Sequence, residues 1–332
     1  MDLGIDLGTA NVLVALKDKG IVFREPSVVA YEKATRRVIA YGNAAKMMLG
    51  KTPENIIAIR PLKDGVIADF TATKLMLKSI VSRVCRRYRV FRPQVVVGVP
   101  SGITEVEERA VEEAIISSGA RSVYLIDEPM AAAIGSGLNV AEPSGNIIVD
   151  IGGGTTEVAV VSLGGTVLSN SIKIAGDEIT EDIINYAKKN LGIIIGENTA
   201  EAVKKEIGCA LPLMAEELRE IRGRDLQTGL PVARDISSSE VEYAIKDSID
   251  EIVECIKQTL EQTPPELISD IAVKGIMLAG GGALIQNIDK YFEEKLAVPV
   301  YVAQDPLDSV ANGTKKMLED METLRKISKS KV

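Results

Sequence analysis

Short apolar runs joined by small-residue turns recur along the chain. Strand-like residues 3–6 lead through a glycine-containing turn into a second strand over 12–16. The same order returns as strand-like residues 147–150, a turn with three glycines and a return strand over 158–161. The pattern predicts two β-hairpins. Each hairpin carries an aspartate where its first strand ends and a glycine two residues later, namely Asp6 with Gly8 and Asp150 with Gly152.

A second pair of segments also repeats. Residues 95–99 predict a buried strand that leads into a helix over 104–118, whose start carries a capping-box signature. Residues 273–279 predict a strand that leads through Gly280–Gly282 into a helix over 283–296. A hairpin followed by strand, turn and helix therefore occurs twice in the same order. We expect two similar α/β domains with a cleft between them.

Two stretches interrupt this repeat. Residues 30–62 predict short strands and a helix, and residues 175–237 are richer in helix and charge. Over 239–263 an apolar residue recurs every three or four positions, which predicts a long amphipathic helix that two prolines end. Residues 308–326 predict a closing helix.

Composition narrows the functional classes. The 332 residues are 46% hydrophobic and contain few aromatics, so aliphatic side chains must fill the cores of two domains. The net charge of −8 lacks the basic footprint of general nucleic-acid binding. The absence of histidine excludes serine–histidine triads and histidine-ligated metals. Cys85, Cys209 and Cys255 lack zinc spacing and are expected to be buried free thiols.

No targeting or membrane-spanning segment is recognisable. No apolar run reaches the ~18 residues that a spanning helix requires, and no signal peptide stands at the first residues. A cytoplasmic protein is therefore expected.

The two hairpin turns carry the strongest chemical signal. Their small residues leave backbone amides open to an anion without interference from Cβ atoms. Two such turns facing each other would hold a triphosphate from both sides. Asp6 and Asp150 would then lie near the phosphates, and because bare carboxylates repel phosphate, a magnesium ion held through water is expected between them. The alternative is that each Asp-x-Gly turn only closes a β-hairpin.

Two further features are candidates for a nucleotide site. Gly280–Gly282 would allow the close approach of an adenine or ribose, although tight packing of a strand against a helix requires similar glycines. Glu128 precedes Pro129 at the start of an alanine-rich helix. Its carboxylate would orient the attacking water in phosphoryl transfer, a reaction that depends mainly on positioning and charge neutralisation. Alternatively, it only stabilises the helix dipole, by about 0.3–1 kcal/mol.

Several longer strings resemble the MreB family of bacterial actin-like proteins, and the resemblance runs from Met1 to about Leu318. It implies an actin-like (ribonuclease H-like) α/β fold of duplicated domains, with four subdomains around a nucleotide cleft and with ATP and Mg²⁺ as cofactors. The strings are DLGTAN at 6–11, EPSVV at 25–29, IRP at 59–61 with KDGVIAD at 63–69, DEPMAAAIG at 127–135 and DIGGGTTEV at 150–158.

The resemblance also assigns residues to the parts of an ATP site. Glu128 and Thr155 would place the hydrolytic water. The phosphates would be contacted by the two turns, at Thr9, Ala10, Asn11, Gly152, Gly153 and Gly154. The adenosine would be flanked by a helix and the glycine turn, at Glu201, Ala202, Val203, Lys204, Gly280, Gly281, Gly282 and Ala283.

Two of these positions have a second interpretation or an unusual residue. Glu201 and Lys204 could be an ordinary exposed i,i+3 ion pair, worth only ~0.2–0.5 kcal/mol. Actins have a lysine in the first phosphate loop, whereas this turn has Asn11. Charge neutralisation would then depend more on magnesium and backbone amides, which predicts a slow ATPase.

The family resemblance further implies a function, an organisation and partners. The chain would form ATP-dependent homopolymeric filaments of paired protofilaments. These would help to determine cell shape by organising cell-wall synthesis with the elongation machinery. The implied subdomains are IA over 1–29, 63–145 and 310–332, IB over 30–62, IIA over 146–174 and 238–309, and IIB over 175–237.

Members of the family assemble on the inner face of the cell membrane. Here the first strand starts at once, so an N-terminal amphipathic helix is not expected. Val90 and Phe91, set among arginines, would form an apolar membrane loop, with the basic tail at 326–331 adding electrostatic attraction. The alternative is a solvated basic loop that covers Phe91 with its own neighbours.

Other functions remain open at this point. A nucleotide-bound scaffold filament with little hydrolysis, or a filament that positions plasmids or organelles, shares the same motifs. A soluble kinase of the superfamily would need a catalytic aspartate in a substrate-binding insertion, and the sequence offers none.

Overall fold

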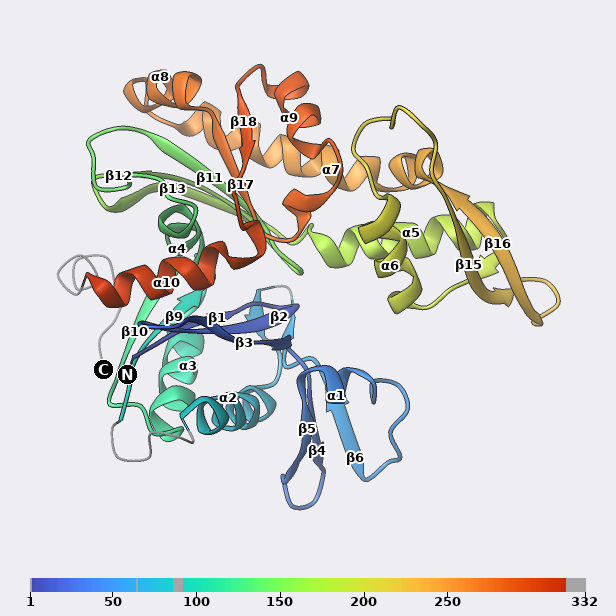
Figure 1. Cartoon of the computed structure of the whole chain (residues 1–332), viewed down its shortest axis with the longest axis horizontal. Helices are drawn as coiled ribbons and strands as arrows, with labels where there is room; N and C mark the ends of the chain where they lie inside the picture. Colours follow the sequence, from blue (N-terminus) through green and yellow to red (C-terminus); the bar gives the residue numbers. More distant parts are fainter. Residues whose placement is uncertain (1, 64, 86–91, 321–332) are drawn as a thin grey trace. The chain divides into compact units, whose positions relative to one another are not determined.

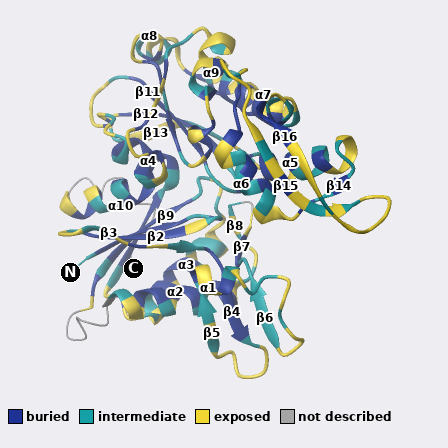
Figure 2. Ribbon diagram, turned by 45° about the vertical axis from the view of Figure 1, so that its right-hand side comes forward, coloured by how far each residue is buried: buried dark blue, intermediate teal, exposed yellow. Residues whose placement is uncertain are grey.

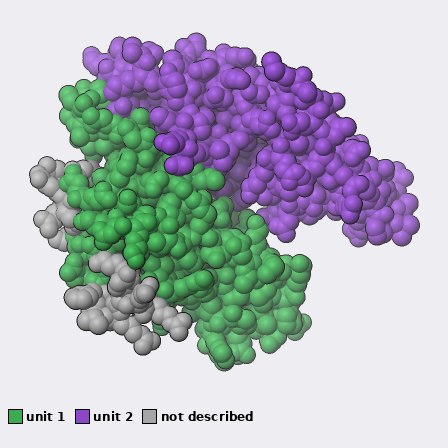
Figure 3. All heavy atoms as spheres, viewed as in Figure 1, with its two compact units in different colours: residues 1–144, 161–169, 307–332 green, residues 145–160, 170–306 purple. Residues whose placement is uncertain are grey.

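The computed structural model describes residues 2–63, 65–85 and 92–320, with only the backbone at residue 85. It divides into two compact units, coloured separately in Figure 3. Unit 1 comprises residues 1–144, 161–169 and 307–332, and unit 2 comprises residues 145–160 and 170–306. The four subdomain boundaries stay a prediction.

The first five-stranded sheet is built around the N-terminal hairpin. Strand β1 (Leu3–Leu7) pairs antiparallel with β2 (Asn11–Leu16) and parallel with β9 (Gln94–Val99), so the first predicted hairpin and the strand predicted over 95–99 share one sheet. In order across the sheet, the strands are β10 (Ser122–Asp127), β9 (Gln94–Val99), β1 (Leu3–Leu7), β2 (Asn11–Leu16) and β3 (Gly20–Pro26).

The second five-stranded sheet repeats this order. Its strands are β13 (Gly165–Ile172), β12 (Thr156–Ser162), β11 (Asn146–Ile151), β17 (Ile276–Ala279) and β18 (Val300–Val302). Here β11 pairs parallel with β17, as β1 does with β9. Asp6 lies opposite Gly98, and Asp150 lies opposite Ala279. The predicted duplication is therefore confirmed in the topology.

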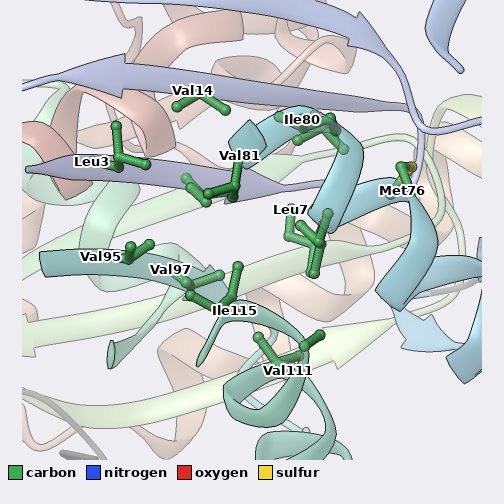
Figure 4. Close-up of a cluster of buried hydrophobic side chains, with 14 of the residues drawn as sticks. Leu3, Leu7, Val14, Met76, Ile80, Val81, Val95, Val97, Val111 and Ile115 are labelled. Atoms are coloured by element: carbon green, nitrogen blue, oxygen red, sulfur yellow. The ribbon is translucent and has the colours of Figure 1, made fainter. Parts of the chain in front are cut away.

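The core of unit 1 lies between its sheet and two helices. Alternate residues of β1 point to one face, where Leu3 and Leu7 pack with Met76, Ile80 and Ile115 (Figure 4). These partners come from the helices α2 (Phe70–Cys85) and α3 (Glu105–Ser117).

The other face of the same sheet is covered by two further helices. Figure 1 shows α4 (Glu128–Gly135) and α10 (Ser309–Glu319) on this face. The approach is close, because a Cβ at Gly4 would lie 2.9 Å from the backbone nitrogen of Lys315. Thr314 and Ala311 of α10 are fully buried. Helix α10 is thus part of the core of unit 1.

Unit 2 contains most of the remaining helices. The predicted amphipathic helix is α7, and its inward residues from Val241 to Thr259 are buried. The helices are α5 (Gly176–Asn190), α6 (Glu197–Ile207), α7 (Ser238–Gln262), α8 (Pro265–Lys274) and α9 (Ile288–Leu296), with a short 3₁₀ turn at η1 (Gly282–Leu284). A second 3₁₀ turn, η2 (Pro306–Asp308), lies where the chain returns to unit 1.

Smaller sheets fill the two insertions. The strands β15 and β16 form an antiparallel hairpin that is largely exposed (Figure 2). The smaller elements are β4 (Val29–Glu32), β5 (Val38–Tyr41), α1 (Gly42–Lys46), β6 (Ile56–Ile59), β7 (Leu62–Lys63), β8 (Val66–Ile67), β14 (Ile193–Ile194), β15 (Leu218–Asp225) and β16 (Pro231–Ser237).

The predicted capping box of α3 is present. The Thr104 hydroxyl accepts a hydrogen bond from the backbone of Glu107, whose carboxylate accepts one from the backbone of Thr104. Cys209 and Cys255 are buried free thiols as predicted, and burial raises the pKa of each to about 11. The side chain of Cys85 lies outside the described residues.

Two element predictions were wrong. The helix predicted over 283–296 is split, because Gln286 leaves the helical path to pair with the backbone at Gly208 and Ala210. Asn287 then takes a left-handed conformation before α9 begins. The strand predicted from residue 273 starts only at Ile276, because Pro265 begins another helix, α8, instead of only ending α7.

Membrane-related predictions are mostly outside the described structure. Val90, Phe91 and the basic tail at 326–331 lie outside the described residues. None of the helices in the described part combines the length and apolar character needed to cross a bilayer.

Candidate nucleotide site

The first glycine turn, residues 8–10, is fixed by Ser27. The Ser27 hydroxyl donates to the Gly8 carbonyl at 2.5 Å, and the Ser27 amide donates to the Ala10 carbonyl at 2.9 Å. Because C=O and N–H point in opposite directions in a trans peptide, these bonds direct the amides of Thr9 and Asn11 away from Ser27. Gly8 must be small, since a Cβ there would lie 2.9 Å from the Asn11 carbonyl oxygen.

A side chain also ties this turn to a neighbouring loop. The Thr9 hydroxyl accepts a hydrogen bond from the Gly65 amide at 3.2 Å. Thr9 is buried and Ala10 is half-buried, whereas Asn11 at the start of β2 is exposed.

Asp6 and Glu128 lie on the same face of the first sheet. Asp6 is buried and is paired in register with Gly98, so a side chain at 98 would point to the face of Asp6. Glu128 begins α4 directly after β10, and its Cγ lies 3.5 Å from where a Gly98 Cβ would stand. Gly98 thus gives the half-buried Glu128 side chain space beside Asp6.

The second glycine turn has the same construction in unit 2. The Gly152 amide donates to the Thr155 carbonyl at 2.9 Å, and a Gly152 Cβ would lie 3.0 Å from that oxygen. The Gly152 and Gly153 carbonyls accept from the amides of Gly176 and Asp177 at 3.1 and 2.7 Å. These bonds direct the amides of Gly153 and Gly154 away from α5.

Asp150 and the triple-glycine turn pack against each other. Gly280 has a φ of +79°, and a Cβ there would overlap with the Ile151 carbonyl and with Asp150 Oδ1. Gly282 similarly faces the Ile151 side chain, while Ala283 is buried. Close packing against the end of β11 therefore requires small residues at Gly280 and Gly282. Burial raises the pKa of Asp150 to about 7.

Helix α6 presents Glu201 and Lys204 to the start of α5. Lys204 Nζ lies 2.6 Å from Glu201 Oε2 and donates to the Gly176 carbonyl at 2.6 Å and to the Thr180 hydroxyl at 2.8 Å. Burial alone would raise the pKa of Glu201, but the ammonium groups of Lys204 and Lys205 lower it to about 2. The interpretation as an ordinary exposed pair is thus wrong, because the Lys204 side chain is only 11% exposed.

The remaining predicted residues on α6 differ in accessibility. Ala202 is half-buried, whereas Val203 is fully buried in the core. Only the backbone of Val203 could therefore meet a nucleotide.

The structure groups the predicted residues within each unit. In unit 1 it brings Asp6 near Glu128, and in unit 2 it brings Asp150, the second turn, the triple glycine and α6 around the end of β11. Sequence reasoning assigned no role to four residues that shape these groups, Ser27, Gly98, Gly176 and Thr180. Ser27 and Gly98 belong to segments already singled out, whereas nothing in the pattern marked Thr180.

No protein-only metal centre is present in the described part of the chain, because no three acidic or cysteine side chains gather there. A metal at Asp6 or Asp150 would need further oxygen ligands from phosphate and water.

Comparison with known proteins identifies the family. The family model described as MreB/Mbl protein matches residues 1–326. The chain belongs to the MreB/Mbl family. It is 49% identical to the cell shape-determining protein Mbl of Bacillus subtilis strain 168, with 98% of each chain covered. It is 51% identical to the cell shape-determining protein MreB of Escherichia coli K12, covering 96% of this chain and 93% of that one.

Solved MreB structures also share the fold. MreB5 of Spiroplasma citri bound to ADP superposes with a TM-score of 0.92 at 42% identity, with 98% of each chain covered. The same protein bound to AMPPNP gives a TM-score of 0.90 at 40% identity, covering 98% of this chain and 97% of that one. The predicted actin-like fold of the MreB family is confirmed.

Proposed function

We propose that this chain is a nucleotide-dependent, actin-like filament protein that helps to determine cell shape. The observation that carries the proposal is the repeated sheet order, with a glycine turn beside a buried aspartate in each copy. The names of the Bacillus and Escherichia relatives support the biological role.

ATP is the nucleotide that the site fits best. The Spiroplasma relative binds ADP and AMPPNP, an ATP analogue. In this chain the amides of Thr9, Asn11, Gly153 and Gly154 point away from the groups that anchor their turns, which suits them to bind phosphate oxygens. Adenosine would lie against α6 and the turn at Gly280–Ala283.

Magnesium would be held by the carboxylates of Asp6 and Asp150, through water. When bound, the ion neutralises charge on the phosphates. The donor set fits, since Mg²⁺ usually keeps several waters and takes one or two carboxylates together with phosphate oxygens. The raised pKa of Asp150 means that this carboxylate must lose a proton before it can take part.

Hydrolysis would be slow and would use Glu128 and Thr155. The Glu128 carboxylate, at the first turn of α4, would accept a hydrogen bond from the attacking water and so orient it. The Thr155 hydroxyl would share that water. Asn11 supplies no positive charge to the phosphates, so turnover would be slow.

We further propose paired homopolymeric filaments on the inner face of the cell membrane. Val90, Phe91 and the basic tail would contact anionic lipid, and the filament would organise the cell-wall elongation machinery. Deletion of Val90 and Phe91 tests the loop by liposome co-sedimentation. Unchanged binding would reject it as the anchor.

One combined experiment tests the central proposal. Electron microscopy with ATP and magnesium should show filaments, and phosphate release should fall in Glu128→Ala. If no nucleotide condition yields filaments, the polymer proposal is wrong. Filaments with equal release by wild type and variant would remove the role proposed for Glu128, and filaments with almost no release by either protein would favour a scaffold with little hydrolysis.

A further inference from the structure

The ammonium group of Lys204 is directed into the protein. It contacts three oxygens within 2.8 Å, belonging to Glu201, Gly176 and Thr180. The Thr180 hydroxyl lies 2.8 Å from the Gly176 carbonyl and 3.0 Å from Glu201, and Thr180 is buried. Three oxygens match the three N–H donors of an ammonium, so the donor capacity of Lys204 is filled by the protein itself.

The same contacts lead directly to the second glycine turn. Gly176, which accepts from Lys204, donates its own amide to the Gly152 carbonyl, and the next amide, of Asp177, donates to Gly153. The fit is close, because a Cβ at Gly176 would lie 3.1 Å from the Gly152 oxygen and 3.4 Å from Lys204 Nζ. A continuous set of hydrogen bonds therefore joins α6, the start of α5 and the turn.

We infer that Lys204 and Thr180 are positioning residues that hold the Gly152–Gly154 turn in its phosphate-binding conformation through Gly176, so that Lys204 does not itself bind the nucleoside. This inference rests on the proposed nucleotide binding. Lys204, which the family resemblance assigns to the adenosine site, is thereby assigned to the support of the phosphate-binding turn.

Lys205 provides a matched control. It also pairs with Glu201 from α6, at 2.8 Å, but its side chain is 68% exposed. In the described part of the chain, the hydrogen bonds from a lysine ammonium to Gly176 and Thr180 come from Lys204. Lys204→Met and Lys205→Met thus remove the same charge from the same helix and the same partner. Only the first breaks the connection to the turn.

The test compares ADP with adenosine. Dissociation constants for ADP are measured by calorimetry, and those for adenosine by competition at millimolar concentration. Lys204→Met and Thr180→Val should weaken ADP binding about tenfold while changing adenosine binding less than twofold. Lys205→Met should change neither, and Thr180→Ser, which keeps the hydroxyl, should restore ADP binding. If Lys204→Met weakens adenosine as much as ADP, Lys204 binds the nucleoside and the inference is wrong.

A second measurement needs no nucleotide. Amide hydrogen exchange at Gly176 and Asp177 should accelerate at least several-fold in Lys204→Met and Thr180→Val but not in Lys205→Met. Equal exchange in all proteins overturns the inference even if Lys204→Met proves too unstable for titration. Absence of ADP binding by the wild type, with accelerated exchange in the variants, would refute the proposed function and leave the connection itself established.

Discussion

Ser27 donates a 2.5 Å hydrogen bond to the carbonyl oxygen of Gly8, and its own amide donates to Ala10. Ser27→Ala keeps the amide bond but leaves the Gly8 carbonyl without the hydroxyl. Gly8 is half-buried, and an intramolecular hydrogen bond typically contributes about 0.5–1.5 kcal/mol. We expect a lower melting temperature and several-fold weaker ADP binding, measured by thermal denaturation and calorimetry.

Ser79 offers the control for that substitution. Its hydroxyl also donates to a backbone carbonyl, that of Leu75 in α2, far along the chain from either turn. Ser79→Ala should leave ADP affinity unchanged. Equal affinity in both variants would show that Ser27 does not shape a binding turn.

Gly98→Ala should separate hydrolysis from binding. The new methyl would lie 2.9 Å from Val310 and 3.5 Å from the Glu128 Cγ. Overpacking of this kind costs about 1–3 kcal/mol and displaces neighbouring side chains. We expect phosphate release to fall severalfold, with ADP affinity within about twofold of the wild type. Gly102→Ala, where a Cβ would meet nothing within 4 Å, should behave as the wild type.

Asp150 should make the stability of the nucleotide-free protein depend on pH. Burial raises the pKa of this carboxyl from 3.8 to about 7. The protonated Asp150 carboxyl therefore contributes fully to the free energy of unfolding below pH 3.8, and this contribution is lost as the pH rises through 7. Asp150→Asn, which cannot ionise, should be more stable than the wild type at pH 8 by up to about 4 kcal/mol, since one pKa unit corresponds to about 1.4 kcal/mol.

Thermal denaturation in EDTA, without nucleotide, measures this difference. It should change little between pH 8 and 7 and then shrink as the pH falls from 7 towards 4. In the presence of magnesium and ATP the order should reverse, because the variant lacks the carboxylate proposed to hold the ion. A constant difference between pH 4 and 8 would contradict the role of Asp150 ionisation.

Gly280→Ala should destabilise the protein more than its backbone conformation alone explains. Gly280 and Gly229 have φ angles of +79° and +72°, which cost an alanine about 1–2 kcal/mol. At Gly229 a Cβ would meet nothing within 4 Å, whereas at Gly280 it would overlap with Ile151 and Asp150. Chemical denaturation should show the Gly280 variant less stable by at least a further 1–3 kcal/mol. Equal losses would mean that the turn at Gly280 relaxes freely.

The repeated hairpins were predictable because their signal is local. In each hairpin an aspartate near the end of a short apolar strand, with a glycine two residues later, indicates a turn, and both turns formed as expected. The duplicated order was also visible in the sequence. A strand–turn–helix segment follows each of the two hairpins. The sequence strings that resemble the MreB family predicted the actin-like fold.

Features that depend on distant contacts were not predictable. Residues 283–296 have helical character, but the pairing of Gln286 with the strand-like backbone at Gly208 and Ala210 outweighs it. Thr180 looks like any polar residue within a helix, and its importance follows only from the approach of Lys204. The prolines at 264 and 265 end one helix and start another, and composition alone does not separate these two uses.

The seating of α10 on β1 has a consequence for the timing of biosynthesis. Gly4 lies against Thr314, and Gly313 lies against Ala131. The first strand therefore gains its packing partner on this face only when residues near 314 have been synthesised. At about 5–20 residues per second, the ribosome would need roughly 15–60 s to supply them. Throughout that interval the part of the sheet face that α10 covers in the finished protein stays without its helix.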